Sequence, residues 1–282
     1  MSTGEQNRQK KIAVLGDLSG YGRCALTVSL PLLSAHGFQV CPVPTAVFSN
    51  HTGFPSFFME DFTDKIPAFV KEWEKLSLTF DGIMTGFLGS IEQVDLVIDF
   101  IKRFKQPDTL LLVDPVMGDN GTAYQTYTKE HCNEMKKLAS LADILTPNLT
   151  EACLLTDTPY KEHFTKKELA ALAERLIPRP GQKLVITGLI VKDRIGSFYA
   201  LRQEDDTLLS GMYSNKKITG LRCGTGDVFA SLITADALSE KDFPHSVQSA
   251  GRFVCKCLAA SDRKHIPPEN GVCFEEFMRL VR

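Results

Sequence analysis

The sequence predicts an α/β protein in which helices cover both faces of a mostly parallel central sheet. Short, continuous apolar runs such as KIAVL (11–15) and LLLVD (110–114) recur along the chain, as expected of parallel strands buried on both faces. Segments with helical periodicity separate these runs, which is typical of right-handed strand–helix–strand units. Polar or glycine-rich residues follow the runs, so they should meet at the carboxyl-end edge of the sheet, where ligands bind in such folds.

The predicted elements alternate from residue 11 onward. Buried strands are expected at 11–15, 39–43, 82–86, 110–114, 143–147 and 183–187. Helical periodicity covers 24–36, 61–76 and 91–104 and recurs between the later strands, whereas 44–57 is interpreted as irregular. After Ile195, the segments GSFYAL and TLLSGMYS predict an antiparallel pair, which precedes a glycine turn and two or three closing helices.

The composition is that of an ordinary globular protein. The 282 residues are 43% hydrophobic and 23% charged, with a net charge of −2, which gives no reason to expect a nucleic acid or an acidic membrane as partner. Without a compositional break, 1–282 is predicted to be a single domain with a polar tail at 1–10. The polar N-terminus, the lack of a spanning apolar run and eight cysteines without Cys-x-x-Cys spacing predict a reduced, cytoplasmic protein.

The loop after the first predicted strand allows three interpretations. Gly20, Gly22 and Ala25 resemble the dinucleotide fingerprint, which would indicate a nicotinamide-dependent oxidoreductase. That fingerprint also needs an acid near the end of the second strand, and VCPVPTAVF contains none. A substrate-facing loop with Asp17 as a polar contact and a plain turn are the other two interpretations.

Oxygen-bearing side chains follow the fourth and fifth predicted strands. Asp114, Asp119, Asn148 and Glu151 should project from neighbouring strand ends, and such oxygens suit Mg²⁺ held partly through water and substrate phosphates. An ordinary turn explains DPVMGD as well, and Asn148 with Glu151 forms the capping-box pattern of a helix start. Metal binding and capping therefore both stand, and only the combination with the other loops favours a metal.

The irregular stretch around SNHTG (49–53) is rich in aromatic residues. His51 alone carries little weight, because an isolated histidine is usually structural or on the surface. The phenylalanines near it indicate either core packing or a pocket for a flat aromatic ligand. They are Phe48, Phe54, Phe57 and Phe58.

The segment GTGDVFAS places two glycines and an acid before an apolar helical run. The turn Gly224–Gly226 would expose N–H groups at the positive end of a helix, which can hold the charge of a phosphoryl group in transfer. Asp227 can accept the proton of an attacking hydroxyl, and the helix dipole is expected to make it a weak base. Neither a Walker A motif nor an H-R-D loop occurs. A non-catalytic nucleotide-binding module is a further alternative, which Asp227 and the metal-type acids disfavour.

Five motifs in this order resemble those of the pyridoxal (pyridoxine/pyridoxamine) kinase family of the ribokinase-like superfamily. They are FSNHTG, FLGS, DPVMGD, TPN-x-x-E and GTGDVFAS, and the resemblance extends over most of 11–260. It implies a three-layer α/β/α sandwich without a separate lid domain, and usually a homodimer. It also implies transfer of the γ-phosphoryl group of ATP to the 5′-hydroxyl of a vitamin B6 vitamer with Mg²⁺, and leaves a monovalent cation open.

The resemblance implies roles for individual residues. Asp227 would be the general base, Gly224, Thr225 and Gly226 would form the anion hole, and Asp114 and Glu151 would hold the metal. The expected ATP-binding residues are Asp114, Thr146, Asn148, Thr187, Gly188, Thr225 and Gly226. The expected vitamer contacts are Asp17, His51, Thr52, Phe87, Tyr127 and Asp227.

Two positions depart from the pattern of that family. Phe87 stands where the family often carries a tyrosine, and Asp17 stands where serine is common. The acid is more similar to the hydroxymethylpyrimidine (phosphate) kinases of thiamin synthesis, which remain the alternative function. A carboxylate at this position is expected to favour a cationic substrate such as pyridoxamine.

Overall fold

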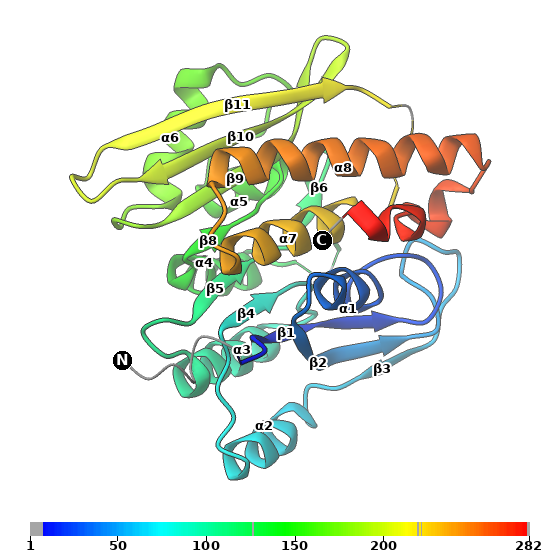
Figure 1. Ribbon diagram of the computed structural model, residues 1–282, viewed down its shortest axis with the longest axis vertical. Helices are drawn as coiled ribbons and strands as arrows, with labels where there is room; N and C mark the ends of the chain where they lie inside the picture. The colour runs from blue at the N-terminus through cyan, green and yellow to red at the C-terminus, as the bar shows by residue number, and fades with distance from the viewer. Residues whose placement is uncertain (1–7, 126, 219, 221, 281–282) are drawn as a thin grey trace.

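A single nine-stranded sheet organises the computed structural model, which describes residues 8–125, 127–218, 220 and 222–280 (Figure 1). The strand order is β11-β10-β9-β8-β5-β4-β1-β2-β3. Six neighbouring strands are parallel: β9 (Lys183–Val191), β8 (Ile144–Leu145), β5 (Leu110–Val113), β4 (Gly82–Thr85), β1 (Lys11–Ser19) and β2 (Gln39–Phe48). Antiparallel strands complete both edges: β10 (Arg194–Arg202) and β11 (Leu208–Lys216) at one, β3 (Met59–Asp61) at the other.

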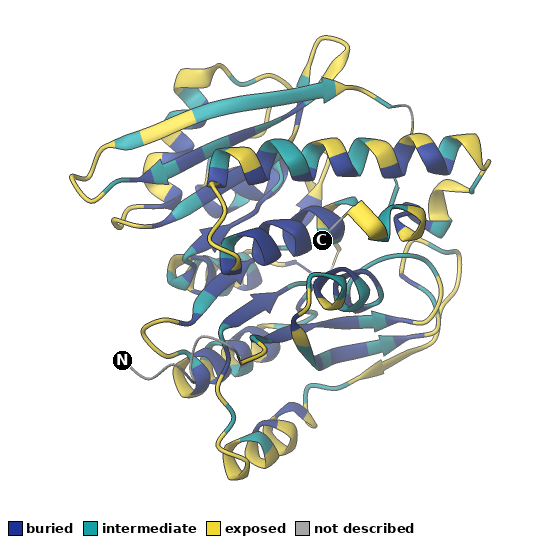
Figure 2. Cartoon of the chain, in the orientation of Figure 1, coloured by how far each residue is buried: buried dark blue, intermediate teal, exposed yellow. Residues whose placement is uncertain are grey.

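Helices cover both faces of this sheet, which confirms the predicted sandwich. One face packs against α1 (Leu26–Ala35), α7 (Thr225–Leu238) and α8 (Phe243–Arg263). The other packs against α2 (Ile66–Lys75), α3 (Ile91–Phe104), α4 (Lys129–Leu141), α5 (Leu149–Leu155) and α6 (Lys166–Leu176). Figure 2 shows the buried sides of these helices turned toward the strands.

The central strands are continuously apolar because each supplies two cores. In β1, Ala13 and Leu15 belong to the core beneath α2–α6, whereas Ile12 and Val14 belong to the core beneath α1, α7 and α8. Successive side chains of a strand point to opposite faces. A strand with helices on both sides therefore has no polar face, which explains why the continuous apolar runs of the sequence correspond to strands.

Several boundaries differ from the predicted ones. The first strand continues to Ser19, so Asp17 lies within β1, and the second continues to Phe48 through a segment that was expected to be irregular. Pro42 and Pro44 pair with β1 on one side only, because β3 pairs only with Ala46–Phe48, and proline is tolerated where one strand edge is free. The strand β3, the hairpin β6–β7 (Gly118–Asp119 and Thr122–Ala123) and the late start of α2 were not predicted.

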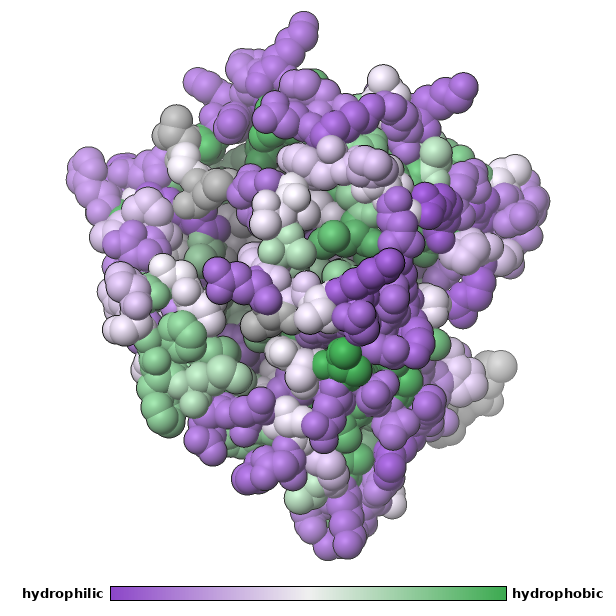
Figure 3. All heavy atoms as spheres, turned by 180° about the vertical axis from the view of Figure 1, so that it is seen from behind, coloured by the Kyte–Doolittle hydropathy of each residue, from purple (hydrophilic) through white to green (hydrophobic). Residues whose placement is uncertain are grey.

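The chain ends and the surface add three observations. Of the predicted tail at 1–10, residues 1–7 lie outside the described residues, and Arg8 forms an ion pair with Asp81 at 2.7 Å. No helix in the described part of the chain is both long and apolar enough to cross a membrane. Figure 3 shows a largely hydrophilic face with an apolar patch over the β3 edge, where Phe57 and Phe58 are exposed.

Candidate active site

Four acidic residues meet at the carboxyl-end edge of the sheet. Asp17 lies in β1, Asp114 follows β5, Glu151 lies in the first turn of α5 and Asp227 in the first turn of α7. The negative charge of Asp227 raises the pKa of both Asp17 and Asp114, and the charge of Asp114 raises that of Glu151, so the four are electrostatic neighbours. The structure thus brings together acids from four separate segments.

Asp17, Asp114 and Glu151 are buried and Asp227 is half-buried, and none of the four has a basic partner within the described residues. Asp17 and Asp114 are 7% exposed and Glu151 is 4% exposed, and no salt bridge to any of the four is found within the described residues. Burial, followed by the charge of Asp227, raises the pKa of Asp17 to about 6 and that of Asp114 to about 8. Burial and Asp114 raise the pKa of Glu151 well above its usual range. A bound cation would favour their charged forms.

The glycine turn before α7 leaves its backbone open. Gly224 caps the helix with a φ of 83°, and a Cβ there would lie 2.1 Å from the carbonyl oxygen of Arg23, so only glycine fits. Gly226 is exposed, and a Cβ there would meet no atom within 4 Å. The first helical N–H to reach Gly224 O is that of Val228. The preceding N–H groups belong to the unsatisfied first turn, which attracts anions.

Asp227 is a stronger base than its helix position predicts. Its side chain accepts a hydrogen bond from the N–H of Ala25, which lowers its pKa, but burial outweighs this and the net pKa is raised. The expectation of a weak base is therefore wrong, because loss of solvation exceeds the stabilisation that the backbone donors provide.

Ala25 has a role at this site that the sequence did not predict, because the sequence placed it only in the pattern similar to the dinucleotide fingerprint. It has φ 50° and ψ −133°, a conformation that costs free energy for any residue with a Cβ and that tends to occur at functional sites. This conformation points its N–H at Asp227. An alanine carries no chemical signal in a sequence, so only the backbone geometry identifies its role.

Asn148 and Glu151 form the capping box that was one of their two predicted roles. Glu151 Oε2 accepts the N–H of Asn148 at 2.7 Å, and Asn148 Oδ1 accepts the N–H of Glu151 at 3.0 Å. Glu151 Oε1 also accepts the N–H of Met117 at 3.1 Å, and Asn148 Nδ2 donates to Gly118 O at 2.8 Å. The box therefore fixes the loop after β5 against α5, close to Asp114.

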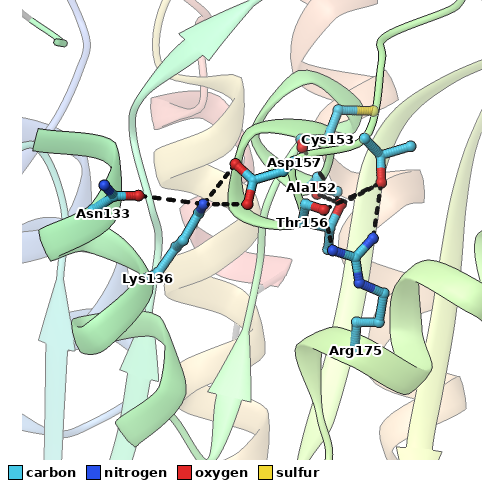
Figure 4. A network of polar contacts seen from close by, with 8 residues as sticks. Asn133, Lys136, Ala152, Cys153, Thr156, Asp157 and Arg175 are labelled. Carbon is cyan, nitrogen blue, oxygen red and sulfur yellow. Dashed lines mark hydrogen bonds and ion pairs between the residues drawn. The ribbon is translucent and has the colours of Figure 1, made fainter. Parts of the chain in front are cut away.

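An ion pair and two hydrogen bonds from an arginine hold the other end of α5 in place (Figure 4). Lys136 of α4 donates to both carboxylate oxygens of Asp157 at 2.7 Å. Arg175 of α6 donates to Thr158 Oγ1 at 3.1 Å and to the carbonyl oxygen of Thr156. Because α5 has only seven residues, fixing its C-terminus also fixes the position of Glu151 at its N-terminus.

The expected nucleotide-side residues lie on neighbouring strand ends. Thr146 follows β8 and donates to Asp114 Oδ1 at 3.3 Å, and Thr187 of β9 bridges to Asn148. Gly188 is exposed with a φ of 75° and open space around it. Thr225 Oγ1 donates to Arg222 O at 3.4 Å, which turns this hydroxyl back into the glycine turn.

The residues expected to contact the vitamer have different surroundings in the structure. Asp17 lies beside Asp227, and Phe87 faces Tyr127 with ring centroids 6.5 Å apart. The Tyr127 hydroxyl, however, donates to Leu88 O at 2.9 Å. Thr52 is exposed. Of the four phenylalanines whose role was left open, Phe48 is buried, Phe54 is half-buried, and Phe57 and Phe58 are exposed, so neither predicted role applies to all four.

Both ring nitrogens of His51 are used within the protein. Gly53 N–H donates to Nδ1 at 3.1 Å, so the proton lies on Nε2, which donates to Glu269 O at 2.7 Å. Cys223 Sγ lies 3.9 Å from Nδ1. The imidazole therefore joins the SNHTG loop to the glycine turn and to the C-terminal segment.

A metal at this edge would have few protein ligands. No group of three or more His, Cys, Asp or Glu side chains suited to holding a metal is present in the part of the chain that the structure describes. Asp114 and Glu151 are two buried carboxyl groups without a counter-charge, and Mg²⁺ characteristically binds one or two carboxylates, waters and substrate phosphates. The donor set fits that ion.

Comparison with known proteins gives the family. Residues 35–270 match the family model described as phosphomethylpyrimidine kinase. A Bacteroides thetaiotaomicron protein provisionally named a phosphomethylpyrimidine kinase is 39% identical, with a TM-score of 0.93 over 98% of this chain and 94% of that one. An orthorhombic crystal form of that protein with pyridoxal gives 38% identity and a TM-score of 0.89, over 97% of this chain and 96% of the other.

Sequence relatives include pyridoxal kinases. The pyridoxal kinase of Sus scrofa is 30% identical over 77% of this chain and 70% of its own length. A protein of Schizosaccharomyces pombe provisionally named a pyridoxal kinase is 28% identical over 74% of this chain, and the match spans 62% of that protein. The fold is therefore ribokinase-like, as expected, and the chain belongs to the phosphomethylpyrimidine kinase family, in its pyridoxal kinase branch.

Proposed function

We propose that this protein transfers the γ-phosphoryl group of ATP to the 5′-hydroxyl of a vitamin B6 vitamer. One observation carries the proposal: a half-buried aspartate of raised pKa, Asp227, lies in the first helical turn directly after an open glycine turn. Phosphoryl transfer needs a positioned proton acceptor and donors for the developing charge, and this turn supplies both.

Each part of the turn has a role in the proposed mechanism. The N–H groups around Gly224, Thr225 and Gly226 bind the phosphate oxygens, and the positive end of α7 stabilises the charge that grows on them. Asp227 accepts the proton of the 5′-hydroxyl, and its raised pKa makes it a better base for this step. The N–H of Ala25 holds the carboxylate in its orientation.

The nucleotide and the metal would occupy the neighbouring strand ends. We assign Asp114 and Glu151 to Mg²⁺, and Thr146, Asn148, Thr187 and Gly188 to the ATP side. Mg²⁺ bound there would neutralise phosphate charge during the transfer. The burial of these two acids without a basic partner in the described residues supports this assignment.

Asp17 would discriminate between vitamers. In every B6 vitamer the substituent at C4 is ortho to the 5-hydroxymethyl group, so a group beside the base Asp227 is within reach of the 4′ position when the ring binds with C4 on that side. Asp17 is such a group, because its pKa responds to the charge of Asp227. The 4′ substituent is an aldehyde in pyridoxal, a hydroxyl in pyridoxine and an ammonium in pyridoxamine, and a carboxylate favours the last.

The second candidate is a hydroxymethylpyrimidine kinase. The name of the matching family model favours it, and the amino group ortho to the hydroxymethyl group of that pyrimidine could also donate to Asp17. A homodimer and the use of a monovalent cation rest on the family resemblance alone, and gel filtration and a K⁺ titration would test them. A cytoplasmic location rests on the polar N-terminus and the cysteine pattern of the sequence.

The deciding experiment is ADP release from Mg-ATP by the purified protein. Pyridoxal, pyridoxine, pyridoxamine and hydroxymethylpyrimidine are offered side by side, and product phosphorylation is checked by mass spectrometry. Turnover of a B6 vitamer, with pyridoxamine ahead of pyridoxal, is the expected result. Exclusive turnover of hydroxymethylpyrimidine would establish the second candidate, and no turnover of any of the four would refute the substrate class.

A further inference from the structure

The chain that follows α8 touches three separate loops of the site. This closing segment, residues 266–275, includes a 3-10 turn at Pro268–Asn270 and ends at Glu275, where a second 3-10 helix begins. Its contacts reach the glycine turn, the loop after β1 and the SNHTG loop. No sequence motif predicts these contacts.

Arg222 and Cys223 attach the glycine turn to the closing segment. Arg222 donates through Nη1 to Ile266 O at 2.6 Å and to Pro267 O at 3.1 Å, and through Nη2 to Asp262 at 2.9 Å. Its side chain is only 5% exposed. The N–H of Val272 donates to Cys223 O at 3.1 Å, so the turn is held by both side chain and backbone immediately before Gly224.

Arg23 attaches the loop after β1 to the same segment. Its Nε donates to Glu275 and its Nη1 to Asn270 O at 3.0 Å, and its backbone forms a bridge with Gly271. A Cβ on Gly271 would lie 2.7 Å from the Arg23 carbonyl oxygen. That same oxygen lies 2.1 Å from where a Cβ on Gly224 would be. Arg23 is therefore packed directly between the closing segment and the glycine turn.

We infer that the closing segment is a positioning element that sets the glycine turn and Asp227 against the loop carrying Ala25. The inference rests on the proposed role of that turn in binding phosphate. Arg222 acts as the buried anchor, and the Arg23–Glu275 pair acts as the surface one. None of these side chains reacts with the substrate. Their effect is geometric, and misplacing reacting groups by about 1 Å can cost on the order of 100-fold in rate.

The chain offers a matched control for the buried anchor. Arg202 is also only 6% exposed and also donates to two backbone carbonyls, those of Ile177 and Asp206, and to Glu174, but it does so at β10, away from the glycine turn. Arg222→Lys and Arg202→Lys should lower the melting temperature by similar amounts. Only Arg222→Lys should lower kcat, by about 10- to 100-fold, while KM for the vitamer changes by less than threefold.

A second pair of variants tests the inference at the surface, where a substitution does not prevent folding. Glu275 pairs with Arg23, whereas the adjacent Glu276 pairs with Arg263 and Lys264. Because exposed pairs contribute little to stability, Glu275→Gln and Glu276→Gln should both melt near the wild-type temperature. Glu275→Gln should lower kcat about threefold to tenfold, and Glu276→Gln should not. In the double variant Arg23→Gln/Glu275→Gln the loss should equal that of Arg23→Gln alone, which removes the contact with Asn270 as well as the pair with Glu275.

Stabilisation by the MgATP complex separates this inference from the proposed function. The rise in melting temperature on adding MgATP should be smaller in Arg222→Lys and Glu275→Gln than in their controls, whichever alcohol the enzyme phosphorylates. If no B6 vitamer is turned over but this difference holds, the proposed substrate fails and the positioning role stands. If wild-type turnover occurs and both members of each pair behave alike in kcat and in the melting shift, the inference is overturned. Should Arg222→Lys not fold, the Glu275 and Glu276 pair decides.

Discussion

Two capping boxes in this protein share a sequence pattern and differ in almost everything else. Asn148-x-x-Glu151 starts α5 and Thr165-x-x-Glu168 starts α6, and both make the reciprocal hydrogen bonds of the motif. Glu168 is exposed, and its hydrogen bond from Lys161, with those from Thr165, lowers its pKa to about 2. Glu151 is buried beside Asp114, and its pKa is raised. Both motifs therefore start a helix, but only the one that contains Glu151 also belongs to the candidate metal site.

The difference shows what separates structural from functional acids in this chain. A structural acid is exposed or has a basic partner, as Glu168 has Lys161, Asp236 has Lys241 and Asp81 has Arg8. Of the acids at the carboxyl-end edge, Asp17, Asp114 and Glu151 are buried and Asp227 is half-buried, and none has a basic partner in the described residues. Burying a charge without a partner costs free energy, and a group of such acids at neighbouring positions is typical of a functional site.

The largest expected difference is between variants of two acids of α7, Asp227 and Asp236. Asp227→Asn should lower kcat by about 10³-fold or more with little change in KM, because the proton acceptor is lost. Asp236→Asn, near the C-terminal end of α7 and paired with Lys241 in the wild type, should keep wild-type kcat. Steady-state ADP release measures both. Equal losses in the two variants would contradict the distinction between paired and unpaired acids.

The two capping boxes themselves give the next test. Glu151→Gln should lower kcat/KM for MgATP by about 10- to 100-fold, as expected for a group that holds or orients a metal. Glu168→Gln removes the equivalent group from α6 and should leave kcat/KM unchanged. A Mg²⁺ titration at fixed ATP reads out both, and the concentration needed for half-maximal rate should rise only in Glu151→Gln. Identical titrations would leave Glu151 with a capping role alone.

Selectivity between vitamers should depend on the charge of Asp17. Its pKa is raised to about 6, so it is neutral at lower pH and charged at higher pH, whereas an aliphatic ammonium such as that of pyridoxamine stays protonated over this range. The ratio of kcat/KM for pyridoxamine to that for pyridoxal should therefore rise about tenfold as the pH increases through 6. In Asp17→Asn the ratio should be low and flat. A ratio that is independent of pH in the wild type would remove the proposed role.

The smallest expected effects are those on thermal stability, and they have opposite signs for Asp17 and Asp81. The pKa of Asp17 is raised on folding, so its contribution is favourable below pH 4 and is lost as the pH rises through about 6. The pKa of Asp81 is lowered by Arg8 and by the N–H of Lys11 against the opposing effect of burial, so its contribution is present above the unfolded pKa and is lost as the pH falls. At pH 8, Asp17→Asn should raise the melting temperature by a few degrees, and Asp81→Asn should lower it by about as much. Thermal melts at pH 5 and pH 8 measure both.

The layers of the fold could be predicted because they depend on burial. The runs at 82–86 and 110–114 are mostly apolar, and α3 begins and ends where the periodicity indicated, with Ser90 as its cap. The edge strands could not be predicted in the same way. The segment Met59–Asp61 is exposed at every residue, and only its pairing with β2 makes it a strand.

The site could be predicted where a residue's chemistry is its signal. Asp17, Asp114, Glu151 and Asp227 carry carboxyl groups after strands or glycines, and the structure brings them to one edge of the sheet. Ala25 contributes through a backbone N–H, and the closing segment through carbonyl oxygens, which any residue type has. Such contributions leave no trace in composition or spacing.

The closing segment also bears on how the protein matures during synthesis. Chains emerge N-terminus first, and folding can begin before translation ends. The nine strands and α7 are complete by residue 238, so the sheet can assemble while the ribosome is still adding α8. The contacts from Glu269, Asn270, Val272 and Glu275 to the three loops can form only after these residues have been synthesised. A nascent chain that ends before residue 269 can thus hold the complete sheet while it still lacks the contacts that are proposed to position the glycine turn.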